Sequence, residues 1–294
     1  MTRCATIVVG FLLLLAASTG LAQDVFGPEN HLVGLSSFFA ARADGAAGNE
    51  TVSSSSSSPD LAVPAPASRM SPDLALTTYL RLASSQLTDL GAYSDKTTIE
   101  ADLPDTSQHG RYELRRSFQA PKTLAYAAVH FAGDGFVKTN VIIRLLQSEV
   151  DHVQKGEGQL TAITSGNYKF SWKGVDTLDG RTFYRYQVKP RQKRPGLFKG
   201  FILVDAATGQ LRRAEGAMIK SPSFFVKKLE FVQDYAAFGQ FSLPVHVHSV
   251  AKTRLVGRAV VDISHDAYQA KSLSEVQSEA RSSNAAGGGS SSNN

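Results

Sequence analysis

Aromatic residues recur at every second position in two consecutive stretches between residues 168 and 190, on either side of Asp179-Gly180. An alternation of period two is typical of a β-strand with one buried and one exposed face. The two stretches therefore predict a β-hairpin with one aromatic face, and another part of the chain must cover that face. Its apolar positions are Tyr168, Phe170, Trp172, Tyr184, Tyr186 and Val188.

The turn of this hairpin decides whether the aromatic residues of both strands share a face. In an unbroken ladder, a two-residue loop at Asp179-Gly180 would place Trp172 opposite Gln187 and split the apolar face. A three-residue loop over residues 178–180 would place Trp172 opposite Tyr186, and the lysines and arginines would gather on the other face. We therefore predict the three-residue loop, with its glycine in the left-handed region as a bulge residue.

The first 22 residues have the three parts of a secretory signal peptide. They begin with a positive charge at Arg3, continue with a short apolar run, and end in small residues before an expected cut after Ala22. Cys4, the one cysteine of the chain, precedes the apolar run, so we do not expect it to anchor a lipid. We predict an exported protein, most simply a periplasmic one, whose mature form has no disulfide and no thiolate metal site.

Composition divides the rest of the chain into three parts. Residues 23–71 contain a run of six serines followed by alanines and prolines, and residues 271–294 end in glycines, serines and asparagines. Such segments bury too little apolar surface to offset the entropy lost on ordering, so we predict that both are disordered. Residues 72–270 are predicted to form one domain of about 200 residues, which is large enough for a hydrophobic core without disulfides.

The predicted domain combines two helices with a long antiparallel meander, so its fold class is α+β. Ser71-Pro72-Asp73 is typical of a helix start, and this helix is expected to end before Gly91. A second amphipathic helix is predicted over residues 140–153, with Glu149 on its polar side. Further strands are predicted at residues 99–103, 112–118, 124–131, 200–204, 210–219, 224–232, 245–250 and 258–263. Short connections favour antiparallel neighbours.

The sequence contains none of the motifs typical of serine hydrolases, zinc peptidases, phosphate-binding loops or calcium loops. We therefore predict no catalytic residue, no cofactor and no metal. The most metal-like feature is His246-Val-His248, whose imidazoles would share one face of a strand, with His265-Asp266 as further candidate ligands. Without an assigned third ligand, a metal-dependent hydrolase is the least favoured interpretation, and solvent-facing histidines are expected.

Turn and strand motifs extend over about residues 72–268. They are the Asp-Gly-Arg turn followed by residues 184–190, residues 201–209 ending in Asp-Ala-Ala-Thr-Gly, residues 212–215, and residues 220–228 followed by Tyr235 and residues 241–244. Together they resemble the outer-membrane lipoprotein-sorting (LolA-like) superfamily, in a branch of exported bacterial proteins. The resemblance implies an unclosed β half-barrel that wraps around two or more helices and encloses an apolar cavity. Relatives carry lipoprotein acyl chains, receive them at the outer membrane, or sense envelope stress by binding partners.

The first functional hypothesis is a non-enzymatic exported protein that binds a lipid, an acyl chain or a lipoprotein in this cavity. The cavity-lining candidates are Tyr168, Phe170, Trp172, Tyr184, Tyr186, Val188, Phe201 and Leu203. The candidates for contact with lipid head groups or an acidic partner are Lys189, Arg191, Lys193, Arg194 and Lys199.

The alternative hypothesis is a periplasmic interaction or envelope-sensing module with a fully packed core. Such a module would meet an envelope protein through its edge strands or its basic loop. In either case, contact with a membrane would be peripheral at most. The formal net charge of +5, without a concentrated basic stripe, predicts no nucleic-acid partner.

Overall fold

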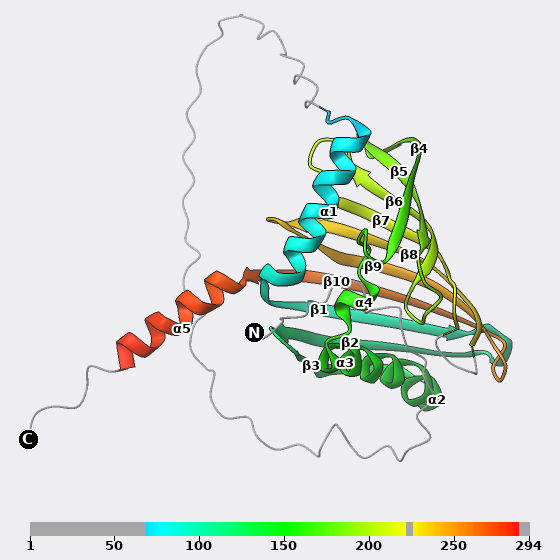
Figure 1. Ribbon diagram of the computed structural model, residues 1–294. Helices are drawn as coiled ribbons and strands as arrows, with labels where there is room; N and C mark the ends of the chain where they lie inside the picture. The colour runs from blue at the N-terminus through cyan, green and yellow to red at the C-terminus, as the bar shows by residue number, and fades with distance from the viewer. Residues whose placement is uncertain (1–68, 222–225, 288–294) are drawn as a thin grey trace, which may run out of the picture. The chain divides into compact units, whose positions relative to one another are not determined.

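The computed structural model describes residues 69–221 and 226–287, which belong to one compact unit (Figure 1). The predicted signal peptide at residues 1–22 and all but the last three residues of the predicted linker at residues 23–71 lie outside the described residues. In the described ranges, no helix has both the length and the apolar character that a membrane crossing requires.

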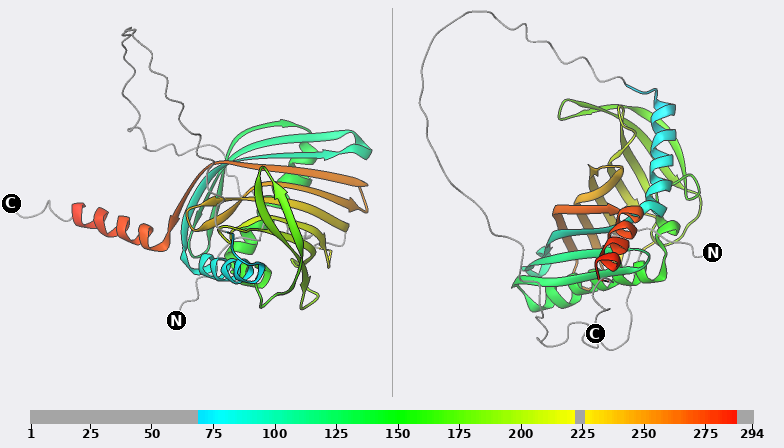
Figure 2. Two further views of the ribbon diagram at one scale, coloured as in Figure 1. Left: turned by 90° about the horizontal axis from the view of Figure 1, so that it is seen from above. Right: turned by 90° about the vertical axis from the view of Figure 1, so that its left-hand side faces the viewer.

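Ten antiparallel strands form one sheet that does not close on itself, in the order β3-β2-β1-β10-β9-β8-β7-β6-β5-β4 (Figures 1 and 2). The strands are β1 (Leu90–Leu103), β2 (Gln108–Gln119), β3 (Thr123–Gly133), β4 (Tyr168–Leu178), β5 (Arg181–Pro190), β6 (Phe198–Asp205), β7 (Leu211–Met218), β8 (Val226–Phe238), β9 (Phe241–Thr253) and β10 (Arg258–Ser272). The pairing of β1 with β10 joins the first and last strands of the chain in the middle of the sheet. The predicted α+β half-barrel is therefore confirmed.

The first helix, α1 (Pro72–Asp89), begins where the sequence predicted. The hydroxyl of Ser71 accepts a hydrogen bond from the backbone N–H of Leu74 at 3.3 Å, and Pro72 occupies the first turn. The predicted second helix is also present, but helical structure begins earlier, with α2 (Gly135–Val137) and a π-helical segment, η3 (Lys138–Ile143). It continues as α3 (Arg144–Lys155), and the short α4 (Gly158–Thr161) follows.

The C-terminal segment corrects one prediction. Residues 271–294 were expected to be disordered, yet β10 extends to Ser272 and α5 (Leu273–Gly287) follows it, whereas residues 288–294 lie outside the described residues. The physical reason is a capping box. The Ser272 hydroxyl accepts from the N–H of Glu275 at 3.2 Å, and the Glu275 carboxylate accepts from the N–H of Ser272 at 2.6 Å. The helix projects away from the sheet (Figures 1 and 2).

Helices cover the concave face of the sheet at two places. Ile142 and Leu146 share a buried cluster with Leu229 of β8, whereas Ala75 of α1 shares a second cluster with Phe231 of the same strand. Residues two apart on a strand point to the same side, so both helices lie on one face. Along the sheet, α1 contacts β6 and α3 contacts β3, so the two helices cover opposite halves of that face.

The hairpin at β4 and β5 corrects the predicted turn but keeps the predicted pairing. Its loop has two residues, because Leu178 pairs with Arg181. Asp179 and Gly180 have φ angles of 52° and 71°, the combination that a tight hairpin turn of type I′ requires. Trp172 nevertheless pairs with Tyr186, because a bulge between Trp172 and Gly174 absorbs one residue. The extra residue lies in the strand rather than in the loop.

Candidate functional site

The aromatic face of β5 is in direct contact with the start of α1. The hydroxyl of Tyr184 donates to the carbonyl of Met70 at 2.6 Å, and the hydroxyl of Tyr186 donates to the carbonyl of Pro72 at 2.5 Å. Both tyrosines are buried. A buried hydroxyl needs such a partner, so these two bonds fasten the helix to the sheet.

Further along α1, Tyr79 fastens the segment that follows α4. Its hydroxyl donates to the carbonyl of Ile163 at 2.8 Å, and both residues are buried. Tyr168 of β4 lies beside them, and its hydroxyl accepts from the backbone N–H of Phe198 at 3.2 Å. Burial raises the pKa of the Tyr79 and Tyr168 hydroxyls, so both remain neutral at physiological pH.

Of the predicted cavity-lining residues, those on β4 and β5 share one face but differ in burial. Tyr168 and Val188 are completely buried, and Phe170 is half-buried, with its ring centroid 6.5 Å from that of Tyr79. Trp172 occupies the same face opposite Tyr186, yet 54% of it is exposed. The elements that cover the concave face do not extend over this part of the end strand.

Two predicted lining residues on β6 lie on the wrong face. Tyr186 pairs with Ile202 and Tyr184 with Val204, so these two β6 residues join the aromatic cluster. Phe201 and Leu203 therefore point to the opposite side of the sheet, where the guanidinium of Arg185 lies 5.2 Å from the centre of the Phe201 ring. An uninterrupted apolar run such as that of β6 does not reveal which alternate residues face the helices.

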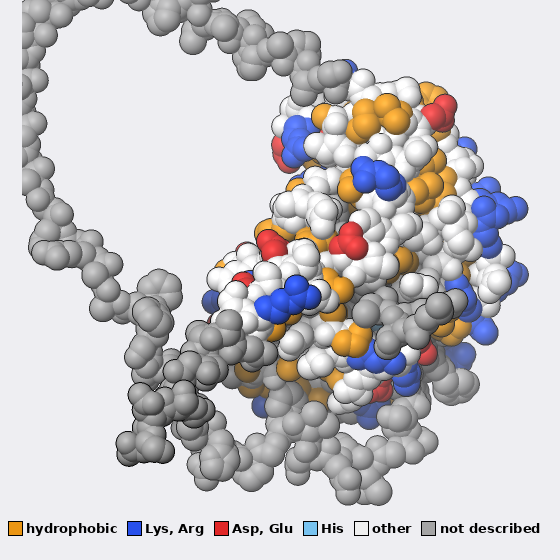
Figure 3. All heavy atoms as spheres, turned by 60° about the vertical axis from the view of Figure 1, so that its left-hand side comes forward, with side chains coloured by type: hydrophobic (Ala, Val, Ile, Leu, Met, Phe, Trp, Pro, Cys, Tyr) orange, Lys and Arg blue, Asp and Glu red, His pale blue; other side chains and the backbone are white. Residues whose placement is uncertain are grey.

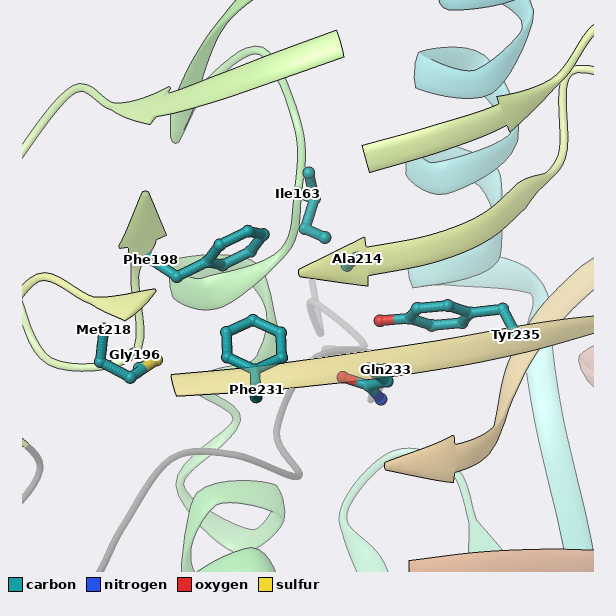
Figure 4. A pocket seen from close by; sticks show the side chains of 8 residues that line it. All are labelled: Ile163, Gly196, Phe198, Ala214, Met218, Phe231, Gln233 and Tyr235. Carbon is teal, nitrogen blue, oxygen red and sulfur yellow. The ribbon is translucent and has the colours of Figure 1, made fainter. Parts of the chain in front are cut away.

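Among the described residues, two small cavities lie between the sheet and the segments that cover it. One has a volume of about 10 Å³ and is enclosed by residues of β6–β8 and the segment after α4 (Figure 4). It is lined by Ile163, Gly196, Phe198, Ala214, Met218, Phe231, Gln233 and Tyr235. The second, of about 30 Å³, lies between α1, Ile163 and Leu211. The smaller volume is about the size that one buried water needs.

The smaller cavity carries two polar atoms that have no hydrogen-bond partner among the described residues. They are the Nε2 of Gln233 and the hydroxyl oxygen of Tyr235, and both residues are buried. Figure 4 shows the Tyr235 hydroxyl directed into the space beside Phe231. Burying a polar group without a partner costs free energy, so this cavity favours an occupant that accepts hydrogen bonds.

The predicted basic residues divide into two groups. Arg191 and Arg194 are built into the fold: the Nε of Arg191 donates to the carbonyl of Ser165 at 2.8 Å, and Arg194 donates to the side-chain oxygen of Asn167. The other three, Lys189, Lys193 and Lys199, are exposed. These lysines extend from the sheet into solvent and remain candidates for contact with a partner.

A buried ionic cluster at the other half of the sheet was missed in the sequence. Arg116 of β2 donates through its Nε to Asp95 at 2.8 Å and lies 3.3 Å from Glu149 of α3. All three residues are buried, although Glu149 was predicted to lie on the polar side of its helix. The sequence did contain a signal for this burial. Arg116 lies two residues from both Leu114 and Phe118, so its side chain points to the same buried face of the strand.

Hydrogen bonds surround this cluster and tie it to the strand β10. The Nδ1 of His265 lies 3.1 Å from Asp95, and Tyr268 lies 2.5 Å from the guanidinium of Arg116. Burial, reinforced by the charge of Arg116, lowers the pKa of His265 to about 4. Burial also raises the pKa of Glu149. The cluster joins α3 to the sheet and reaches no described cavity, so we regard it as structural.

The predicted histidine pair lies on β9, and both side chains are partly exposed to solvent. His248 and His246 approach the same carboxylate oxygen of Asp262, at 2.7 Å and 3.7 Å. His265 belongs to the buried cluster instead, so it does not join them. Among the residues that the structure describes, no group of three or more histidine, cysteine or acidic side chains has an arrangement that could hold a metal ion.

No family model matches the chain, and no curated protein matches its sequence. Among solved structures, it is similar to a LolA superfamily protein from Nitrosomonas europaea, at 9% identity over 66% of this chain and 92% of that chain, with a TM-score of 0.35. A DUF1329 family protein from Desulfovibrio piger has 11% identity over 67% and 92%, with a TM-score of 0.36. The lipoprotein LppX from Mycobacterium tuberculosis has 10% identity over 67% and 96%, with a TM-score of 0.23.

Proposed function

We propose that the chain is an exported, non-enzymatic protein of the periplasm that binds another macromolecule through the outer surface of a packed half-barrel. One observation carries the proposal: the aromatic face is occupied by the protein's own helix. Tyr184 and Tyr186 are buried and donate hydrogen bonds to the backbone at the start of α1. A guest on this face would have to replace both bonds and the apolar contacts of α1.

The dimensions of the cavities support the same proposal. Sites for small molecules usually enclose about 300–1,000 Å³. The two cavities beside Ile163 have volumes of about 10 and 30 Å³. An acyl chain does not fit in either of these two cavities, which supports a partner that meets the half-barrel from outside. Export is supported by the three-part pattern of residues 1–22 in the sequence.

A second candidate function is that of an acyl carrier whose concave face opens. The observation that favours it is the pair of unpaired donors, Gln233 and Tyr235, at the cavity in Figure 4. Two donors at the end of an apolar cluster suit the carboxylate or ester carbonyl of a fatty-acyl group. Binding would require the segment around Ile163 to move away from Tyr79.

The two candidates differ in what the protein contains when it is isolated. The mature protein should be purified from a periplasmic extract, and its native mass and its organic extract should be measured. The proposal predicts the mass of the polypeptide alone, an extract without stoichiometric lipid, and no binding of a fluorescent fatty-acyl probe. A stoichiometric acyl lipid, or a probe that saturates at one site, would reject the packed half-barrel in favour of the carrier.

A Tyr184→Phe, Tyr186→Phe double variant sharpens this comparison, because it removes both hydroxyl bonds to α1 and keeps the rings. For a packed module, the variant loses stability but binds no acyl probe. For a carrier, the variant binds the probe more tightly than the wild-type protein, because less work is needed to open the concave face.

A further inference from the structure

We infer that β4 is the docking edge of the half-barrel, and that its occupant is an extended acidic segment of a partner protein, which joins the sheet as a further strand. This inference rests on the proposed function and specifies its partner. β4 is one end of the ten-stranded sheet. An end strand carries a row of backbone N–H and C=O groups without a neighbouring strand, and strand addition uses such a row. The other end strand, β3, contacts α3.

Apolar side chains on β4 favour this edge as a binding surface. Trp172 and Val175 are each 54% exposed, whereas the residues opposite them on β5, Tyr186 and Tyr184, are buried. The apolar face of the sheet therefore continues onto β4 beyond the part that is covered. An added strand would cover both side chains, and tryptophan is one of the residue types enriched among strong anchors of interfaces.

The opposite face of β4 and its neighbours is basic. Lys169 pairs with Lys189, and the pairing of Val188 with Gly200 places Lys199 beside Lys189 on the next strand. Like charges in such positions repel each other unless an anion lies between them. Figure 3 shows lysine and arginine side chains gathered along the right-hand edge of one face of the molecule, with fewer acidic side chains.

The acidic side chains near this basic face are already engaged. Asp176 lies 2.7 Å from Arg185, and Glu215 lies 3.7 Å from the same guanidinium. Across residues 69–221 and 226–287, no ion pair involves Lys169, Lys189 or Lys199. These exposed lysines are therefore available to carboxylates of an added strand, so a partner strand with acidic residues on that face would gain charge complementarity.

The same charges argue against a second copy of this chain at the edge. Two β4 strands side by side would bring Lys169 and Lys173 of one copy close to those of the other, and lysines on edge strands are a common protection against such pairing. An acidic strand gains from these lysines, whereas a second β4 is repelled by them. The edge therefore selects its partner by charge.

Trp172 is the one tryptophan of the chain, so its fluorescence reports on this edge directly. The probe is a tryptophan-free peptide about as long as β4, which has 11 residues, with alternating glutamate and valine. Valines would face Trp172 and glutamates would face Lys169 and Lys189. At low salt, we expect the emission of Trp172 to shift to shorter wavelength with saturable binding, and the affinity to fall as salt is added.

Two control peptides separate strand addition from simple charge attraction. A peptide of the same sequence with every backbone nitrogen methylated keeps the charge and the valines but has no N–H donor, and a peptide of alternating lysine and valine reverses the charge. We expect neither to shift the emission. The Lys169→Glu, Lys189→Glu variant should lose at least about tenfold in affinity, whereas Lys252→Glu, at an exposed position on β9, should not.

Equal binding of the N-methylated peptide, or an unchanged affinity of the double charge-reversal variant, would overturn the inference. A shift with vesicles of phosphatidylethanolamine and phosphatidylglycerol, but not with the acidic peptide, would instead assign the edge to a lipid surface. These outcomes are distinct from a failure of the proposed function, because that failure appears as bound acyl lipid in the purified wild-type protein, whatever the peptides do.

Discussion

Arg116 is the cation that contacts both carboxylates of the buried ionic cluster. Its guanidinium contacts Asp95 and Glu149, and it lies 4.9 Å from the centre of the Tyr93 ring. Each carboxylate is buried, so each depends on this cation for compensation. A buried ion pair adds little net stability over an apolar pair, but the loss of one partner is costly.

We therefore predict that Arg116→Met destabilises the protein by about 3–5 kcal/mol, because two buried carboxylates lose their cation. The matched control is Arg115→Met at the neighbouring position of the same strand, which is exposed. That substitution should change the free energy of unfolding by less than about 0.5 kcal/mol. Urea unfolding of both variants measures the difference, and equal losses would show that the cluster does not need its arginine.

The second prediction at this scale concerns pH. Folding lowers the pKa of His265 from its ordinary value of 6.5 to about 4, so the unfolded chain takes up a proton first as the pH falls. This contribution is fully present above pH 6.5 and is lost as the pH falls toward 4, up to about 3 kcal/mol in total. The raised pKa of Glu149 acts in the opposite direction in the lower part of that window.

A His265→Asn variant isolates the histidine. Between about pH 7 and pH 5, the wild-type protein should lose more of its free energy of unfolding than the variant, because only the wild type has this proton to take up. Urea unfolding at the two pH values gives the comparison. If the free energy of unfolding falls equally for the two proteins between pH 7 and pH 5, that result would contradict the burial of a neutral His265.

At the scale of single elements, the hairpin of β4 and β5 has the sharpest backbone requirement. Gly180 has a φ of 71°, and no atom lies within 4 Å of the position that a Cβ would occupy, so the cost of a side chain there is a backbone cost. We predict that Gly180→Ala destabilises the protein by about 1 kcal/mol. Gly135 is the control, because it also has free space but does not have a positive φ. Thermal unfolding should give a lower melting temperature for Gly180→Ala than for Gly135→Ala, and equal melting temperatures would contradict the positive φ at the turn.

The same hairpin shows what sequence alone can and cannot predict about an element. The alternation of Tyr168, Phe170 and Trp172 predicted the strand, its aromatic face and the partner of Trp172. The bulge that produces this pairing was placed in the loop, although the strand contains a signal for it. Gly174, with a φ of 144°, lies at the bulge, and the apolar positions change phase there from Trp172 to Val175. The missed α5 also had a signal, since Ser272 and Glu275 have the spacing of a capping box.

The candidate site was predictable only in part, for a related physical reason. The alternation of residues along a strand shows which side chains share a face, but it does not show what covers each face. Tyr184 and Tyr186 were correctly grouped, yet only the fold shows that they bind the start of α1. Phe201 was assigned to the wrong face because the run from Phe201 to Val204 is apolar throughout. Glu149 was placed in solvent because its partner, Arg116, comes from a distant strand.

At the scale of the whole folded unit, two helices, α1 and α3, cover the concave face of the sheet. α1 and α3 pack against opposite halves of one sheet, and the segment around Ile163 lies between them. This arrangement leaves β4 with its exposed Trp172 as the part of the aromatic face that is not covered. The proposal of an outer binding surface depends on α1 being part of the core rather than a lid.

Hydrogen exchange of the α1 amides in the mature protein tests this dependence most directly. Because Ala75 and Tyr79 are buried in the same cluster as Tyr186 and Phe231, we predict that the central α1 amides exchange only through global unfolding, as slowly as those in the middle of β1 and β10. Addition of a fatty-acyl probe should leave these rates unchanged. Fast exchange of α1 alone, through a local opening that the probe suppresses, would contradict the packed half-barrel.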